Sequence, residues 1–146
     1  REPALAPGPC MADLHIEDFY KDGVCVLLQL YFAFPRRISV FVEDICGPDT
    51  VDEFGLHSKR HLGCLGAMLW LAEEGFLRYT DTIRQDAIDQ AVLTQKAFLL
   101  LSAHAPATER WPAQISQAER LRDLLRHASS TQLADYARQL LFAQPH

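Results

Sequence analysis

Three side chains able to bind a metal ion lie close together in the sequence. His57, His61 and Cys64 are spaced by four and three residues, so on a helix they would share one face. Imidazole and thiolate are ligands that zinc prefers, and Cys46 would supply a fourth. No C-x-x-C or H-x-E motif includes these residues, and Cys64 falls beside the apolar stripe of its helix. We therefore expect a core cysteine, two surface histidines and no bound metal.

Sequence motifs for catalysis are also missing. The chain contains no G-x-S-x-G sequence, no phosphate-binding loop and no dinucleotide-binding fingerprint. Carboxylates such as Asp44, Asp81 and Asp86 are scattered along polar stretches, where they more simply cap turns and solvate the surface. The chain is therefore not expected to be an enzyme or to hold a cofactor.

Length and composition indicate one ordinary globular domain. The chain has 146 residues, of which 49% are apolar and 23% charged, with a net charge of −5. This charge excludes binding to nucleic acid or to an anionic membrane through bulk charge, although a local basic patch remains compatible with it. The longest apolar run, residues 24–34, is shorter than the roughly 20 residues of a membrane-spanning helix.

The four cysteines indicate a reduced protein. None forms a C-x-x-C pair, and isolated cysteines in a chain of this size are usually buried as small apolar residues. No charged segment followed by an apolar one opens the chain, so we expect no export signal and a cytoplasmic location. Two disulfides in an exported protein are the alternative.

The first part of the chain predicts a tail, a buried helix and a short extended segment. Residues 1–12 are rich in proline and expected to be disordered or foreign to the protein. Residues 16–34 predict a central buried helix, which Pro35 ends. In residues 36–46, apolar alternation favours a strand, whereas a strand at 38–39 followed by a helical turn at 40–45 is the alternative.

The middle of the chain predicts a helix, a hairpin and a second helix. Ser58 would cap a helix that ends at Gly75, with Leu62, Leu65 and Leu69 on its buried stripe. Strands at 76–80 and 87–93 would form a hairpin, with residues 81–86 as the connection. Thr94 would cap a helix at 95–104.

Two helices are expected near the C-terminus, after a linker at residues 105–112. Ser116 and Glu119 have the spacing of a capping box, and residues 129–131 break the helical pattern. Helices this short are marginal alone in water, so their apolar stripes must pack, within the chain or across a two-fold axis. We expect a homodimer, with the stripe residues among its interface: Leu121, Leu125, Leu133, Tyr136 and Leu140.

Two segments in the middle of the chain resemble the winged-helix superfamily of small bacterial proteins. The sequence WLAEEGFLRY at 70–79 is similar to the end of a recognition helix entering the wing, and AVLTQKAFLL at 91–100 to the last wing strand and the next helix. Here Ala97 takes the place of the usual glycine. The resemblance covers residues 14–103 and implies an α+β, mostly α fold with a two-stranded wing, to which residues 110–143 would add a helical extension.

The resemblance implies either DNA recognition or protein interaction. In a DNA-binding member, Ser58, Lys59 and Arg60 would enter the major groove, and Arg84 would lie at the tip of the wing. Residues 49–94, however, carry eight acidic and four basic side chains, and an acidic loop at 47–56 precedes the helix. This local acidity disfavours binding to phosphates.

The outward face of the predicted 58–74 helix favours protein interaction. Gly63, Gly66 and Trp70 fall on it, and each glycine costs a helix about 1 kcal/mol relative to alanine. Either a partner helix or the protein's own C-terminal helices would cover this face. We therefore expect a non-catalytic interaction module that self-associates or binds a protein, with a DNA-binding regulator as the alternative.

Overall fold

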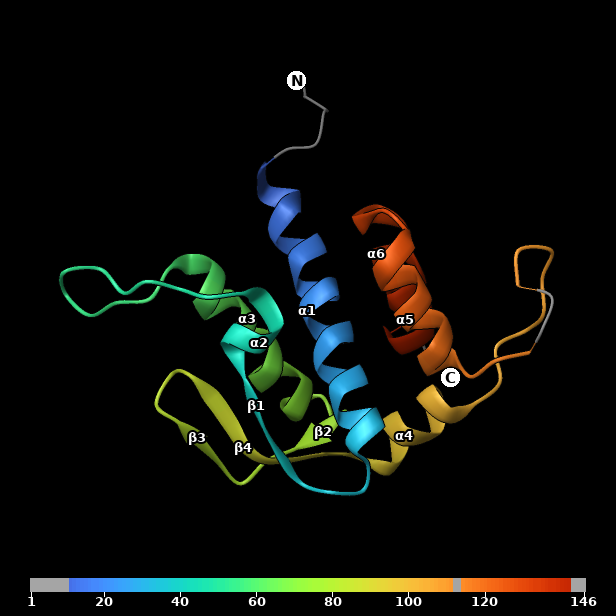
Figure 1. The fold of residues 1–146 in the computed structure, drawn as a ribbon, viewed down its shortest axis with the longest axis horizontal. Coiled ribbons are helices and arrows are strands. Elements are labelled where there is room, and N and C mark those ends of the chain that lie inside the picture. Colours follow the sequence, from blue (N-terminus) through green and yellow to red (C-terminus); the bar gives the residue numbers. More distant parts are fainter. Residues whose placement is uncertain (1–10, 112–113, 143–146) are drawn as a thin grey trace.

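The computed structural model describes residues 11–111 and 114–142, which form a mostly helical α+β fold with six helices and a small antiparallel sheet (Figure 1). The elements in chain order are α1 (Met11–Ala33), β1 (Ile38–Phe41), α2 (Val42–Cys46), α3 (Lys59–Glu73), β2 (Leu77–Arg78), β3 (Asp81–Ile83), β4 (Ala87–Leu93), α4 (Gln95–Ser102), α5 (Gln117–His127) and α6 (Ser130–Ala137). A single π-helical turn, Arg138–Phe142, follows α6.

Helix α1 runs through the middle of the fold, between α3 on one side and α5 and α6 on the other (Figure 1). Because neighbours pack on both sides, Val24, Val26 and Leu27 are fully buried, as expected for a central helix. The helix begins at Met11, within the segment predicted to be disordered, so that prediction is corrected for Met11 and Ala12. Residues 1–10 lie outside the described residues.

Strand β4 is the centre of the sheet and pairs antiparallel with β1, β2 and β3. The predicted pairing of 76–80 with 87–93 is confirmed by β2 and β4, but the predicted connection is wrong, because residues 81–83 form a third strand that also pairs with β4. The turn is confined to residues 84–86, where Arg84 takes a positive φ of 50°. Strand β1 passes directly into α2, which confirms the predicted alternative of a short strand followed by a helical turn, although the strand extends to Phe41 and the turn begins at Val42.

Helix α3 is capped as predicted but is rotated from its predicted orientation. The Ser58 side chain accepts a hydrogen bond from the backbone N–H of His61 at 3.1 Å. Leu62, expected on the buried stripe, is 40% exposed, whereas His61 is 1% exposed. The reason is that α3 presents its 61, 64, 68 and 71 positions to α1 and α2.

The C-terminal helices pack on α1 within the chain. Leu121 and Leu133 are buried in the same core as α1, and Leu125, Tyr136 and Leu140 are partly buried against it. The apolar stripes are therefore covered without a second subunit, and Leu121 and Leu133 offer no surface to a partner. Ser116 caps α5, and the predicted break before α6 holds a complete capping box.

The cysteines and helices of the described residues show no sign of a crosslink or a membrane span. Cys25, Cys46 and Cys64 are free thiols, and Cys10 lies outside the described residues. Cys64 is fully buried, which confirms the prediction of a core cysteine. No helix within residues 11–111 and 114–142 has both the length and the apolar character needed to cross a membrane.

Candidate functional sites

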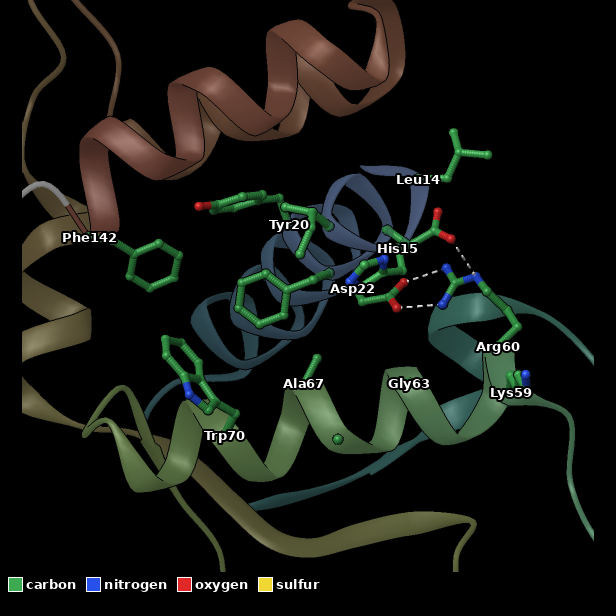
Figure 2. Close-up of a pocket in the computed structure, with 14 residues that line it drawn as sticks. Leu14, His15, Tyr20, Asp22, Lys59, Arg60, Gly63, Ala67, Trp70 and Phe142 are labelled. Carbon is green, nitrogen blue, oxygen red and sulfur yellow. Dashed lines mark hydrogen bonds and ion pairs between the residues drawn. The ribbon is translucent and has the colours of Figure 1, made fainter. Parts of the chain in front are cut away.

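A groove with a volume of about 840 Å³ lies between the first half of α1 and the outward face of α3 (Figure 2). Helix α1 contributes apolar side chains at its start, and α3 contributes the face that the sequence analysis assigned to interaction. The residues that define the groove are Leu14, Ile16, Phe19, Gly63, Gly66 and Trp70. This surface is apolar at its centre and bordered by the cation of Lys59.

Gly63 and Gly66 have no side chains that would fill the groove at the surface of α3. A Cβ atom added to Gly63 or Gly66 would meet no atom within 4 Å outside the helix's own backbone. Neither glycine is therefore required by packing within the chain, although each weakens the helix. Ala67, next to them, also lines the groove and is buried there (Figure 2). Small residues here leave room for another molecule to approach the helix backbone.

Trp70 closes one end of the groove within an aromatic cluster. Its ring lies edge-on to Phe19, with centroids 5.3 Å apart, and to Phe142, with centroids 5.6 Å apart. Phe142 belongs to the π-helical turn after α6, so the C-terminal segment reaches this face at one point. Trp70 is still 39% exposed, and Gly63 and Gly66 remain exposed. The chain's own C-terminal helices therefore leave the groove largely open.

Arg60, predicted as a DNA contact, instead joins α3 to α1. Its Nη1 and Nη2 atoms lie 2.6 and 2.7 Å from the two carboxylate oxygens of Asp22, and its Nε lies 3.6 Å from Asp18 (Figure 2). Asp22 is buried, and its hydrogen bonds to Arg60 raise the pKa of that guanidinium further above its usual value. Arg60 is therefore already satisfied inside the fold.

The other predicted DNA contacts lie at the start of α3 and in the turn between β3 and β4. Ser58 caps α3 through its side chain, and Lys59 is exposed at the border of the groove. Arg84 is exposed in the turn between β3 and β4, beside a second cavity of about 350 Å³. The cavity beside Arg84 is also lined by Asp86, so a carboxylate lies next to this cation.

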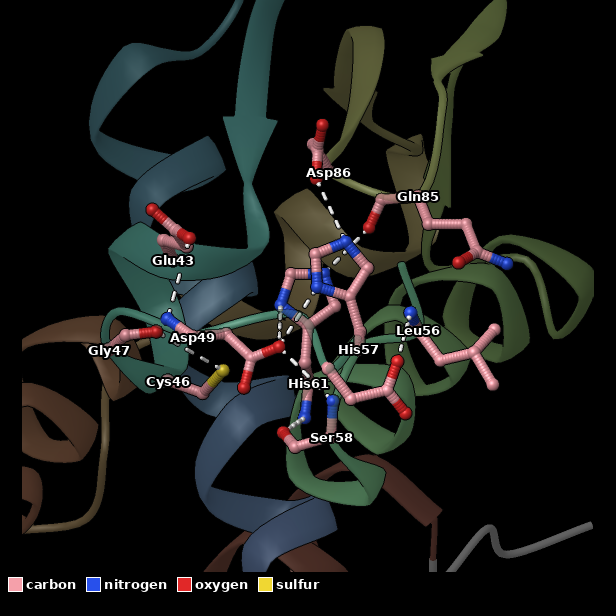
Figure 3. Close-up of polar contacts among 11 residues, drawn as sticks. Glu43, Cys46, Gly47, Asp49, Leu56, His57, Ser58, His61, Gln85 and Asp86 are labelled. Carbon is pink, nitrogen blue, oxygen red and sulfur yellow. Dashed lines mark hydrogen bonds and ion pairs between the residues drawn. The ribbon is translucent and has the colours of Figure 1, made fainter. Parts of the chain in front are cut away.

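A polar cluster forms where the loop before α3 meets the turn between β3 and β4 (Figure 3). Oδ2 of Asp49 lies 2.9 Å from Nδ1 of His57 and 3.8 Å from Nδ1 of His61. Nε2 of His57 lies 3.3 Å from Oδ1 of Asp86, and Nε2 of His61 lies 2.7 Å from the backbone oxygen of Gln85. The two imidazole rings are stacked, with centroids 3.7 Å apart.

Asp49 is the residue of this cluster that the sequence analysis missed. The hydrogen bonds that it accepts from Ser58 and His57 lower its pKa from 3.8 to about 2. Cys64, expected to share a face with the two histidines, lies in the apolar core, where burial raises its pKa. The prediction of two surface histidines is wrong for His61, because α3 turns this residue inward.

The loop between α2 and α3, residues 47–58, has an exposed apolar tip at Phe54. Phe54 is 78% exposed, and Val51 and Leu56 beside it are also exposed. The tip is held in shape by Asp52, whose Oδ1 accepts hydrogen bonds from the backbone N–H groups of Phe54 and Leu56 at 2.8 and 2.9 Å. An apolar side chain is thus presented to solvent by an ordered turn.

No protein-family model, no curated protein and no solved structure matches this chain. The function of these sites is therefore argued from their geometry.

Proposed function

We propose that this protein is a non-catalytic winged-helix interaction module, and that it associates with a second copy of itself through the groove between α1 and α3. The observation that carries the proposal is the open apolar groove, in which Gly63 and Gly66 leave space that no other part of the described chain fills. Exposed apolar surfaces rimmed by polar residues are typical of protein-association sites.

The order of the elements supports a winged-helix architecture. Helix α1, strand β1, the short helix α2, helix α3 and the β2–β4 hairpin follow one another as the resemblance implies. Two features are specific to this chain: α2 has five residues, and the segment from 47 to 58 separates it from α3. A DNA-binding relative would insert the helix that corresponds to α3 into the major groove of DNA. In this chain, the outward face of α3 lines the apolar groove.

The occupant that fits the groove best is the exposed loop tip of a second copy. The tip offers an apolar side chain, Phe54, flanked by the acidic Asp52 and Glu53. The groove offers an apolar floor, and the charged residues at its border are Lys59, Arg60, Asp18 and Asp22. An apolar side chain of one copy would therefore meet the apolar floor of the other.

Symmetry allows this contact to occur twice. The loop precedes α3 in the chain, and the first turn of α3 lines one end of the groove. With a two-fold axis near that turn, the loop of each copy would bind in the groove of the other. A reciprocal exchange doubles the buried surface, which helps it to reach the roughly 1,000 Å² of a specific interface.

The placement of the basic residues favours this function over DNA binding. Arg60 is engaged by Asp22 and Asp18, and Ser58 serves as a helix cap. Counterion release from phosphates, which supplies most non-specific DNA affinity, would depend on the few cations that remain free. A DNA-binding regulator would be retained on heparin and would shift a random duplex at low salt, whereas the proposed module would do neither.

Light scattering on the full-length chain over a concentration series tests the proposal. We expect a dimer mass that falls toward that of a monomer on dilution. Phe54→Ser should shift the equilibrium to monomer, because it removes the apolar side chain that fills the groove. The matched control is Leu99→Ser, which changes an exposed apolar residue on α4, away from the groove, and should leave the dimer intact. A monomer at every concentration would overturn the proposal.

A further inference from the structure

We propose that Asp49, His57 and His61 form a binding site for one divalent transition-metal ion, with zinc as the ion that fits the ligands best. One ligand atom from each of these residues lies within 4.8 Å of the other two. Imidazole nitrogens with a carboxylate oxygen are a zinc ligand set, and three protein ligands leave one tetrahedral position open. This site is separate from the groove and does not depend on the proposed self-association.

The first argument is a buried nitrogen without a hydrogen-bond partner. His61 is 1% exposed, and its Nε2 lies 2.7 Å from the backbone oxygen of Gln85. A carbonyl oxygen can only accept, so Nε2 must carry the proton, and in the neutral ring Nδ1 carries the lone pair. This Nδ1 is buried, makes no hydrogen bond and lies 3.8 Å from Oδ2 of Asp49. A lone pair facing a carboxylate in this way calls for a cation between them.

The second argument is that both histidines are oriented by acceptors behind them. Nε2 of His57 lies 3.3 Å from the carboxylate of Asp86, and Nε2 of His61 contacts the carbonyl of the preceding residue, Gln85. Histidine ligands of metals almost always donate their second ring N–H to such a carboxylate or carbonyl. Two neighbouring residues of one turn therefore fix both rings with Nδ1 on the side of Asp49.

The third argument is the spacing of the ligand atoms. Two ligands of a tetrahedral zinc ion, each about 2.0–2.2 Å from the metal, are about 3.4 Å apart. The distances from Oδ2 of Asp49 to the two Nδ1 atoms are 2.9 and 3.8 Å, which lie on either side of this value. Because each Nδ1 lone pair lies in the plane of its ring, one of the two stacked rings would also tilt for both nitrogens to reach one ion.

The charge of the cluster also suits a divalent cation. With neutral imidazoles, Asp49 and Asp86 give the cluster a charge of −2. The rings of His57 and His61 are stacked, with centroids 3.7 Å apart and an interplanar angle of 6°. Two protonated rings in this arrangement would repel each other, so protonation of both histidines is a poor way to balance the carboxylates. One bound dication balances them without that repulsion.

An ion can reach the cluster from solvent. The side chains of His57 and Asp49 are 15% and 11% exposed. His57 and Asp86 also border the cavity of about 350 Å³ that Arg84 lines. The outer ligands therefore face water, whereas His61 anchors the site from the core.

Titration of zinc chloride into the chelator-treated full-length chain, followed by calorimetry and elemental analysis, tests the site. We expect one zinc ion per chain. His57→Ala should abolish stoichiometric binding, and Asp86→Asn, which keeps all three ligands, should weaken it by about 10- to 100-fold. The matched control is His127→Ala, which removes an exposed histidine that also lies beside an aspartate, Asp123, and should bind zinc as the unaltered protein does.

Nitrogen NMR of the imidazole rings gives a readout that general loss of structure would not reproduce. Zinc should displace the proton that Nδ1 of His57 donates to Asp49 and shift the Nδ1 resonances of both histidines, and in the zinc-bound chain Nε2 should be protonated on both rings. Circular dichroism of the variants without zinc should match that of the unaltered protein treated with chelator. The proposal is overturned if the folded chain binds no stoichiometric zinc, if His57→Ala binds it equally well, or if the ion is bound through Nε2.

Discussion

Arg60 on α3 is clamped to Asp22 on α1 by two parallel hydrogen bonds of 2.6 and 2.7 Å. The pair lies at one end of the groove, where it fixes the distance between the two helices that form the walls (Figure 2). It also gives a basic residue near the start of α3 a role in the fold. The same residue is therefore a sensitive point for stability.

Arg60→Ala should lower the free energy of unfolding by about 2–3 kcal/mol, because it leaves the buried Asp22 without its charged partner. The loss should stay in this range, since the Arg60 side chain is itself 37% exposed and water can replace part of the interaction. Urea unfolding followed by circular dichroism measures it.

The control for this variant is Arg138→Ala. Arg138 forms an exposed pair with Asp135 at 3.2 Å, and such pairs contribute little, so we expect a loss under about 1 kcal/mol. Equal losses in the two variants would contradict the structural role given to the Arg60–Asp22 pair.

Gly66→Ala should raise the free energy of unfolding of the monomer by up to about 1 kcal/mol, because alanine is the better helix former and its Cβ meets open space. If the groove binds a second copy, the same change should weaken the dimer. Gly75→Ala is the contrasting variant, since Gly75 has a φ of +86° that alanine adopts with strain, and it should destabilise the fold. Unfolding below the concentration of dimerisation, with light scattering above it, separates the two effects.

The helices were predictable from the sequence because their signals are local. Ser58, Thr94 and Ser116 each cap the helix that they were predicted to cap. The rotation of α3 was not predictable, because residues 61 and 62 differ in burial through contacts with α2, which comes from another part of the chain. Strand β3 was missed because its residues are all exposed and it is defined by pairing with β4.

Acid should remove a stabilising contribution of Asp49. Its pKa is lowered in the folded chain from 3.8 to about 2, so the folded state favours the ionised carboxylate. This contribution is fully present above pH 3.8 and is lost as the pH falls toward 2. In metal-free protein, the difference in unfolding free energy between the unaltered chain and Asp49→Asn should therefore shrink over that interval. A difference that stays constant between pH 5 and pH 2 would contradict the assignment.

Leu133→Ala should destabilise the fold by about 2–4 kcal/mol, because this side chain of α6 is buried against the common core. Leu99→Ala, which shortens an exposed leucine on α4, should cost under about 1 kcal/mol. A small loss for both variants, measured by thermal unfolding, would show that the C-terminal helices are dispensable for the core.

The candidate sites were partly visible in the sequence. The spacing of Gly63, Gly66 and Trp70 identified the face of α3 that lines the groove, since helical periodicity alone places them together. The wall supplied by Phe19 and the role of Asp49 depend on how distant segments pack, and periodicity carries no such information. Phe54 lies in a loop, and a single apolar residue there gives no periodic signal. The available signal was the pair Asp52 and Gly55 on either side of it, which indicates an ordered turn.

The most direct test of the central claim is an isotope-filtered NMR experiment on a mixture of labelled and unlabelled full-length chain. The account predicts contacts between the Phe54 ring of one copy and the Trp70 indole of the other, and their loss in Phe54→Ser. A dimer that lacks these contacts, or a chain that stays monomeric at the concentrations of the experiment, would contradict it.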